Sequence, residues 1–168
     1  RPCYRRLSMN EVESIIMVKS LSWITVILLM TLIFYFSHQP VTISNDLSTG
    51  ITEHIIETVE IIAPIEDVNI DTINHIVRKN AHFFIYFLLG IFLINALKKS
   101  GINGYISGGL ALFFCMTYAV SDEVHQLFVT GRGAQVGDVL IDSTGAALGI
   151  ILSSIIIFFT SLLYSFQG

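Results

Sequence analysis

The sequence predicts an all-α membrane protein, a bundle of about four transmembrane helices with an additional amphipathic helix outside the membrane. Hydrophobic residues make up 53% of the 168 positions and charged residues 13%, whereas soluble domains carry about a quarter charged residues. Mean hydropathy is +0.72. Long apolar stretches alternate with short polar ones, and the polar side chains suited to chemistry cluster beside the stretch ends.

The apolar stretches have approximately the length that a bilayer requires. They run from about Leu21 to Phe36, Ala81 to Leu97, Ile102 to Val120 and Leu140 to Tyr164. The second is short, but a turn from Asn74 to Asn80 can extend it. No small-x-small cleavage site follows the first, which favours an uncleaved helix over a signal peptide. We therefore expect one transmembrane domain over residues 21–164.

Residues 1–20 are expected to form a cytoplasmic N-terminal segment, with Met9 or Met17 as a candidate native start. Residues 41–80 are expected to form an extracytoplasmic loop and helix. Within this loop, isoleucine and valine recur at helical spacing opposite three glutamates, before Pro64, which predicts an amphipathic helix. The apolar positions are Ile51, Ile55, Ile56, Val59 and Ile62, and the acidic ones are Glu53, Glu57 and Glu60.

Lysine and arginine placement predicts the orientation. Six of these residues lie before the first stretch or between the second and third, and three lie on the other side. Both termini are therefore expected in the cytoplasm of a multi-pass protein, with the acidic loop outside. No basic stripe indicates nucleic acid, and the two cysteines, Cys3 and Cys115, are too few for a disulfide framework or a zinc cluster.

A first polar cluster enters the second stretch. Its members are separated by three or four residues, which places them on one helix stripe. They are Asp71, His75, Lys79, His82 and Tyr86. Charged side chains at the mouth of a span are expected to face protein or water. The alternative is that Lys79 extends to the interface and His82 bonds a neighbouring carbonyl.

A second cluster, from Ser121 to Gln126, follows the third stretch directly. If the helix continues, Asp122 and Gln126 share one face, as do Ser121 and His125. A buried carboxylate here needs a cation, a metal or its own proton. The alternative is a solvated loop with its acids in water.

A third cluster begins with Arg132 between two glycines, which allow a tight turn and a two-toothed contact with a carboxylate or phosphate. Asp138 and Asp142 follow, one helical turn apart, and one of them is expected to interact favourably with the helix N-terminus. Further small residues predict close approach of a neighbouring helix. These are Gly145, Ala146, Ala147 and Gly149.

These clusters supply the candidate site residues. The catalytic candidates are His82, Asp122, Glu123 and His125. The substrate-binding candidates are Lys79, His82, Tyr86, Gln126, Arg132 and Asp142. The cofactor is unknown, with a divalent metal as one option, and the metal-ligand candidates are Asp122, Glu123, Asp138 and Asp142.

The three clusters, in this order, resemble the VanZ-like family of bacterial membrane proteins. The matching pieces are Phe36-Ser37-x2-Pro40, Arg78-Lys79-x2-His82-Phe83-x2-Tyr86-x2-Leu89-Gly90, Ser121-Asp122-Glu123-x-His125-Gln126-x-Phe128, Gly131-Arg132, and Asp138-Val139-x2-Asp142-x2-Gly145. Two departures are visible. Thr130 stands where the family usually has proline, and Ile85 stands where many members carry glutamate.

The resemblance implies a multi-span protein of the bacterial cell membrane. The family is named for a member associated with low-level resistance to teicoplanin, a lipid-tailed glycopeptide. It supplies no agreed catalytic residues, so the motif positions are expected only to form a functional surface.

Three functions fit these residues, and the oligomeric state stays open. The first is a protein that binds or modulates an amphiphile or envelope lipid at the outer leaflet, contributing to teicoplanin resistance. The second is a membrane-embedded hydrolase or transferase, with or without a metal ion, acting on lipid-linked substrates. The third is a small transporter or flippase, which the confinement of charge to one side and the lack of a repeat disfavour.

Overall fold

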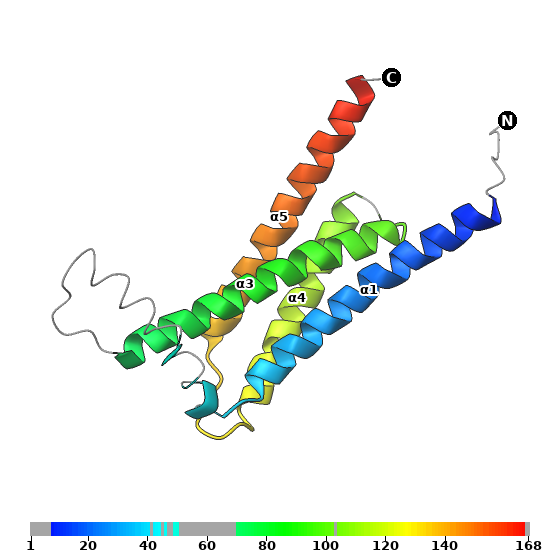
Figure 1. Cartoon of the computed structure of the whole chain (residues 1–168). Coiled ribbons are helices and arrows are strands. Elements are labelled where there is room, and N and C mark those ends of the chain that lie inside the picture. Colours follow the sequence, from blue (N-terminus) through cyan, green and yellow to red (C-terminus); the bar gives the residue numbers. More distant parts are fainter. Residues whose placement is uncertain are drawn as a thin grey trace.

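The computed structural model describes residues 8–40, 42–44, 46, 49–50, 70–102 and 104–166. These residues form four long helices and no strand (Figure 1). The helices are α1 (Met9–Ser37), α3 (Ile70–Lys99), α4 (Tyr105–Gln126) and α5 (Val136–Phe166). The predicted all-α fold is confirmed. The amphipathic helix expected over residues 51–62 lies outside the described residues.

Three of the helices, α1, α3 and α5, are long and apolar enough to cross a membrane, as expected of a multi-pass membrane protein. The fourth, α4, is not among them; its 22 residues include Asp122 and Glu123 close to its end. At 1.5 Å per residue it is still roughly 33 Å long, similar to the apolar thickness of a bilayer. The predicted count of about four spans is therefore approximate.

The helices extend beyond the apolar stretches that predicted them. Helix α1 begins at Met9 rather than near Leu21, because Ser8 and Glu11 form a capping box. The Glu11 carboxylate accepts a hydrogen bond of 2.8 Å from the Ser8 N–H. Helix α4 continues past Val120 to Gln126, which is the continuation that places Asp122 and Gln126 on one face. Hydropathy locates the lipid-facing part of a helix, whereas caps locate its ends.

Helices α3 and α5 approach each other through glycine. A Cβ atom at Gly145 would collide with the carbonyl oxygen of Phe83, and one at Gly149 with that of Phe87. From the other side, a Cβ at Gly90 would collide with the carbonyl of Ala146. The two backbones are thus in direct contact, as predicted for the small residues of the last stretch.

The two chain ends lie at the same end of the helix bundle, as Figure 1 shows. At that end the Trp23 indole donates a hydrogen bond of 3.0 Å to the Ser100 hydroxyl. Further along the bundle the Tyr118 hydroxyl donates to the Met30 carbonyl at 2.6 Å. The opposite end collects the end of α1, the start of α3, the end of α4 and the start of α5. All three polar clusters belong to that end.

Candidate functional site

A polar pocket of about 100 Å³ lies at the end of the bundle opposite the chain termini. Residues of α3, α4, α5 and the loop between α4 and α5 line it. They are Arg78, Lys79, His82, Glu123, Gln126, Gly131, Arg132, Gly133, Gln135, Asp138, Ile141 and Asp142. The pocket therefore draws on all three clusters of the sequence.

Two of the pocket acids have partners of their own. The Lys79 ammonium lies 2.6 Å from the Asp138 carboxylate, and Asp138 also occupies the first turn of α5, where the helix dipole favours negative charge. The Glu123 carboxylate accepts a hydrogen bond of 2.8 Å from the backbone N–H of Gln135. Glu123 thereby ties the loop before α5 to α4. Both acids have a structural explanation.

The loop between α4 and α5 presents Arg132 to the pocket. Gly131 has a φ of 78°, a left-handed conformation that glycine adopts without steric cost. Gly133 does not have a positive φ of this kind. The Arg132 Nη2 donates a hydrogen bond of 3.2 Å to the carbonyl of Phe36 at the end of α1. Its buried Nε has no hydrogen-bond partner among the described residues. Within the part of the chain that the structure describes, Arg132 forms no ion pair.

Burial lowers the pKa of Arg132 from its ordinary value, and the nearby charge of Arg78 lowers this pKa further. An arginine side chain nevertheless stays protonated in proteins. Two guanidinium groups that repel each other beside a pocket favour an anion bound near both.

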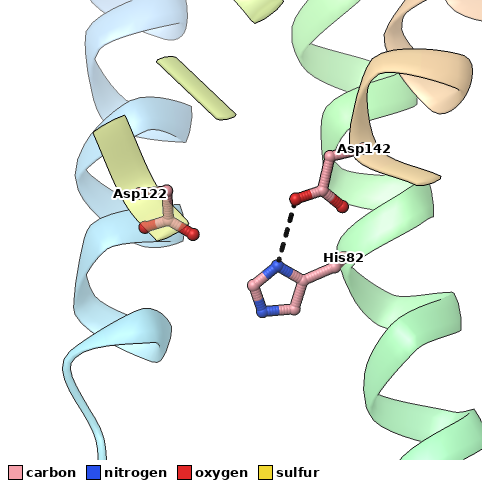
Figure 2. Close-up of side chains that lie close together, drawn as sticks. All are labelled: His82, Asp122 and Asp142. Carbon is pink, nitrogen blue, oxygen red and sulfur yellow. Dashed lines mark ion pairs between the residues drawn. The ribbon is translucent and has the colours of Figure 1, made fainter. Parts of the chain in front are cut away.

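Three side chains from three helices converge beside the pocket, and two of them, His82 and Asp142, line it. Figure 2 shows His82 of α3, Asp122 of α4 and Asp142 of α5 pointing toward one another. The His82 Nδ1 lies 3.7 Å from the Asp142 Oδ2. One oxygen of Asp122 accepts hydrogen bonds from the Ser37 hydroxyl at 2.7 Å and the Gln126 amide at 3.2 Å. Its other oxygen, and both oxygens of Asp142, receive no hydrogen bond from any described residue.

A second, apolar pocket of about 320 Å³ adjoins the polar one. It lies between α1, α3 and the segment that follows α1. Its lining residues are Ile33, Phe36, Gln39, Ser44, Val77, Arg78, Ala81, His82, Ile85 and Arg132. Arg78, His82 and Arg132 line both pockets, so the two pockets share one wall of basic side chains.

A comparison with protein-family models matches residues 22–159 to the VanZ/LLP1 model, which is most of the chain. The chain belongs to the VanZ/LLP1 family. The matched range contains every residue that lines the two pockets. No curated protein and no solved structure matches this VanZ/LLP1 chain significantly.

The VanZ/LLP1 structure brings most of the sequence candidates together and separates others. His125 lines neither pocket; it lies 3.1 Å from a ring nitrogen of His38, with its ring against Phe34. Tyr86 is fully buried in the core beside Tyr118 and also lines neither pocket. His75 is likewise outside both pockets, and the Asp71 side chain lies outside the described residues.

Ser37 and Arg78 belong to this site but were not among the sequence candidates. Ser37 is fully buried and donates to Asp122, and Arg78 lines both pockets. Both belong to motif pieces, beside Phe36 and Lys79 respectively. Their sequence signal was a polar residue next to a stretch end, which does not reveal the partner on another helix.

Proposed function

We propose that this VanZ/LLP1 protein binds an anionic amphiphile, with the headgroup in the polar pocket and the apolar chain in the adjoining pocket. The observation that carries the proposal is the wall of Arg78, His82 and Arg132 shared by the two pockets. Such a wall lies where the charged and apolar parts of an amphiphile meet. The apolar pocket, at about 320 Å³, falls within the roughly 300–1,000 Å³ usual for small-molecule sites.

The headgroup is anionic because of Arg132. Its guanidinium has a backbone carbonyl as partner and a buried Nε without one, so donor capacity remains for a phosphate or carboxylate. Lys79 is less available, since Asp138 holds it.

The positive-inside rule orients the site toward the outer leaflet of a bacterial cell membrane, with both termini in the cytoplasm. A site there would meet envelope lipids, lipid-linked precursors and lipid-tailed antibiotics. Resistance to teicoplanin would follow if the protein sequestered the drug's tail or the lipids with which it associates.

The test is photo-crosslinking of the full chain in nanodiscs with a diazirine-bearing phosphatidylglycerol and a matched phosphatidylcholine. We expect preferential labelling by the anionic probe, and at least about a tenfold loss in Arg132→Gln, since a hydrogen bond to a charged group contributes ~1.5–3 kcal/mol. The control is Lys98→Gln, which removes a cation from the far end of α3. Equal labelling of wild type and Arg132→Gln would contradict the proposal.

A second candidate function, an enzyme acting on lipid-linked substrates, draws on the His82–Asp142 pair. A carboxylate beside an imidazole orients it and strengthens it as a general base. The test is release of phosphate or headgroup from labelled undecaprenyl-linked substrates by the full chain. An activity that His82→Gln abolishes and His125→Gln leaves intact would favour the enzyme; no release by wild type would exclude it for these substrates.

A further inference from the structure

We infer that His82, Asp122 and Asp142 form a binding site for one divalent transition-metal ion, Mn²⁺ or Zn²⁺. One ligand atom from each residue can be chosen so that all lie within 4.8 Å of one another. Each side chain comes from a different helix, and all point inward (Figure 2). The inference deepens the proposed function, because the ion would lie beside the headgroup pocket.

The buried carboxylates are the first argument. Asp142 is 1% exposed and Asp122 is 3% exposed, yet three of their four oxygens receive no hydrogen bond from the residues that the structure describes. The His82 Nδ1, at 3.7 Å from Asp142, is beyond hydrogen-bond distance. Buried polar atoms without partners are rare, and a buried carboxylate without compensation is strongly destabilising. A bound cation would be the partner that these oxygens lack.

Two of the neighbouring cations have partners elsewhere. Lys79 is held by Asp138 at 2.6 Å, and the Arg132 guanidinium donates to the carbonyl of Phe36. Two carboxylates consequently face one imidazole. A divalent ion would balance both charges.

The donor set suits a transition-metal ion. Imidazole nitrogen favours ions such as Zn²⁺, and carboxylate oxygen also accepts Mn²⁺. Ligand atoms at about 2.1 Å from such an ion lie roughly 3.5 Å apart, so small side-chain rotations would close the present arrangement. Three protein ligands leave a coordination position open. A headgroup phosphate, held by Arg132, could occupy that position.

The hydrogen bonds behind Asp122 support the same reading. Ser37 and Gln126 both donate to one oxygen of Asp122, which fixes that carboxylate and leaves the other oxygen free. Partners behind a ligand orient it toward its metal ion.

The test is titration of the chelator-treated full chain with Mn²⁺ alone, followed by electron paramagnetic resonance, and competition by Zn²⁺. We expect one Mn²⁺ per chain, and affinities weaker by at least about tenfold in Asp142→Asn and His82→Ala, since even groups behind a ligand contribute 10–100-fold. His125→Ala, a histidine near the same end but outside both pockets, should bind as wild type does.

Thermal unfolding supplies a second readout. Mn²⁺ should raise the Tm of wild type but not that of Asp142→Asn, because only a folded site binds the ion. Absence of one-to-one binding in wild type, or unchanged affinity in Asp142→Asn, would overturn the inference. A loss in Asp138→Asn as large as in Asp142→Asn would overturn it too, by showing diffuse attraction to an acidic surface.

The two proposals fail separately. Lipid labelling in the presence of a chelator tests the amphiphile site alone, and Mn²⁺ titration in lipid-free detergent tests the metal site alone. Labelling without metal binding would overturn only this inference. Metal binding without labelling would overturn only the proposed function.

Discussion

Lys79 of α3 and Asp138 of α5, which both line the polar pocket, form an ion pair of 2.6 Å. The pair explains why two aspartates one turn apart at the start of α5 have different environments. Asp138 has a cation, whereas the nearest basic group to Asp142 is the imidazole of His82, at 3.7 Å. Asp138 therefore has a structural partner, whereas Asp142 remains the candidate for function.

Removing this ion pair should have only a small effect on stability. Both side chains are about one-quarter exposed, at 26% and 27%, and pairs that water can reach contribute roughly 0.2–1 kcal/mol. A double-mutant cycle with Lys79→Met and Asp138→Asn, measured by unfolding in detergent, should give a coupling energy in that range. A coupling several times larger would mean that the pair is effectively buried by lipid.

Enlarging the glycines between α3 and α5 should be far more damaging. Gly149→Ala places a methyl group against the Phe87 carbonyl, and overpacking of this kind destabilises by about 1–3 kcal/mol. The measurement is the Tm in detergent. Gly109→Ala in α4 is the control, because nothing lies within 4 Å of its added Cβ, and alanine should be neutral or stabilising there. A Gly149→Ala variant as stable as wild type would contradict the close contact.

Removing the Ser37 hydroxyl should destabilise the fold, because the Asp122 carboxylate loses a hydrogen-bond donor. Ser37 donates to the buried Asp122 carboxylate at 2.7 Å, and hydrogen bonds to charged groups contribute ~1.5–3 kcal/mol. Ser37→Ala should lower the Tm correspondingly. Thr31→Val is the control, since the Thr31 hydroxyl bonds only a carbonyl of its own helix, at 2.8 Å from Ile27, and is exposed. An equal loss in both variants would argue against a special role for Ser37.

Filling the apolar pocket should shorten the chains that the protein accepts. Ala81→Phe adds a ring to a residue that lines this pocket. Excluding about two methylene groups, at ~0.8 kcal/mol each, would weaken binding of long-chain probes roughly tenfold. Labelling by anionic probes of graded chain length measures this effect. Ile76→Phe on the same helix, at an exposed residue outside the pocket, should label as wild type does, and equal effects of both variants would place the chain elsewhere.

The two histidines of the motif pieces should behave differently. His82 lines both pockets, whereas His125 lies against His38 and Phe34. We expect His125→Phe to keep anionic-lipid labelling, because phenylalanine preserves the ring contact, and His82→Phe to lose it. Loss of labelling in His125→Phe with an unchanged Tm would move the site toward the end of α1.

Much of the fold follows from the sequence because hydropathy is a strong local signal. The apolar stretches, the spacing that joins Lys79 to His82, and the small residues of α5 all depend on neighbours along one helix. The apolar stretch does not reveal where α1 starts, because residues 9–20 are helical without being strongly apolar, and the capping box at Ser8 sets the N-terminal end of the helix.

The pairings between helices could not be predicted in the same way. Asp122 and Glu123 are adjacent in sequence, yet one faces His82 and Asp142 while the other holds the backbone of Gln135. Likewise, nothing in the sequence distinguishes Ser37 and Arg78 from the other polar residues near the ends of the apolar stretches. Their roles depend on the rotation of α1 and α3 about their axes and on where the neighbouring helices lie, which local spacing does not specify.

The contact between Phe83 and Gly145 has a consequence for the chemistry. Phe83 follows His82 directly, and Gly145 lies one helical turn beyond Asp142, so the separation of imidazole and carboxylate depends on how closely two main chains touch. A single methyl group at residue 145 would widen that separation without replacing either His82 or Asp142. The geometry of the pair can therefore be adjusted from a residue that carries no functional group.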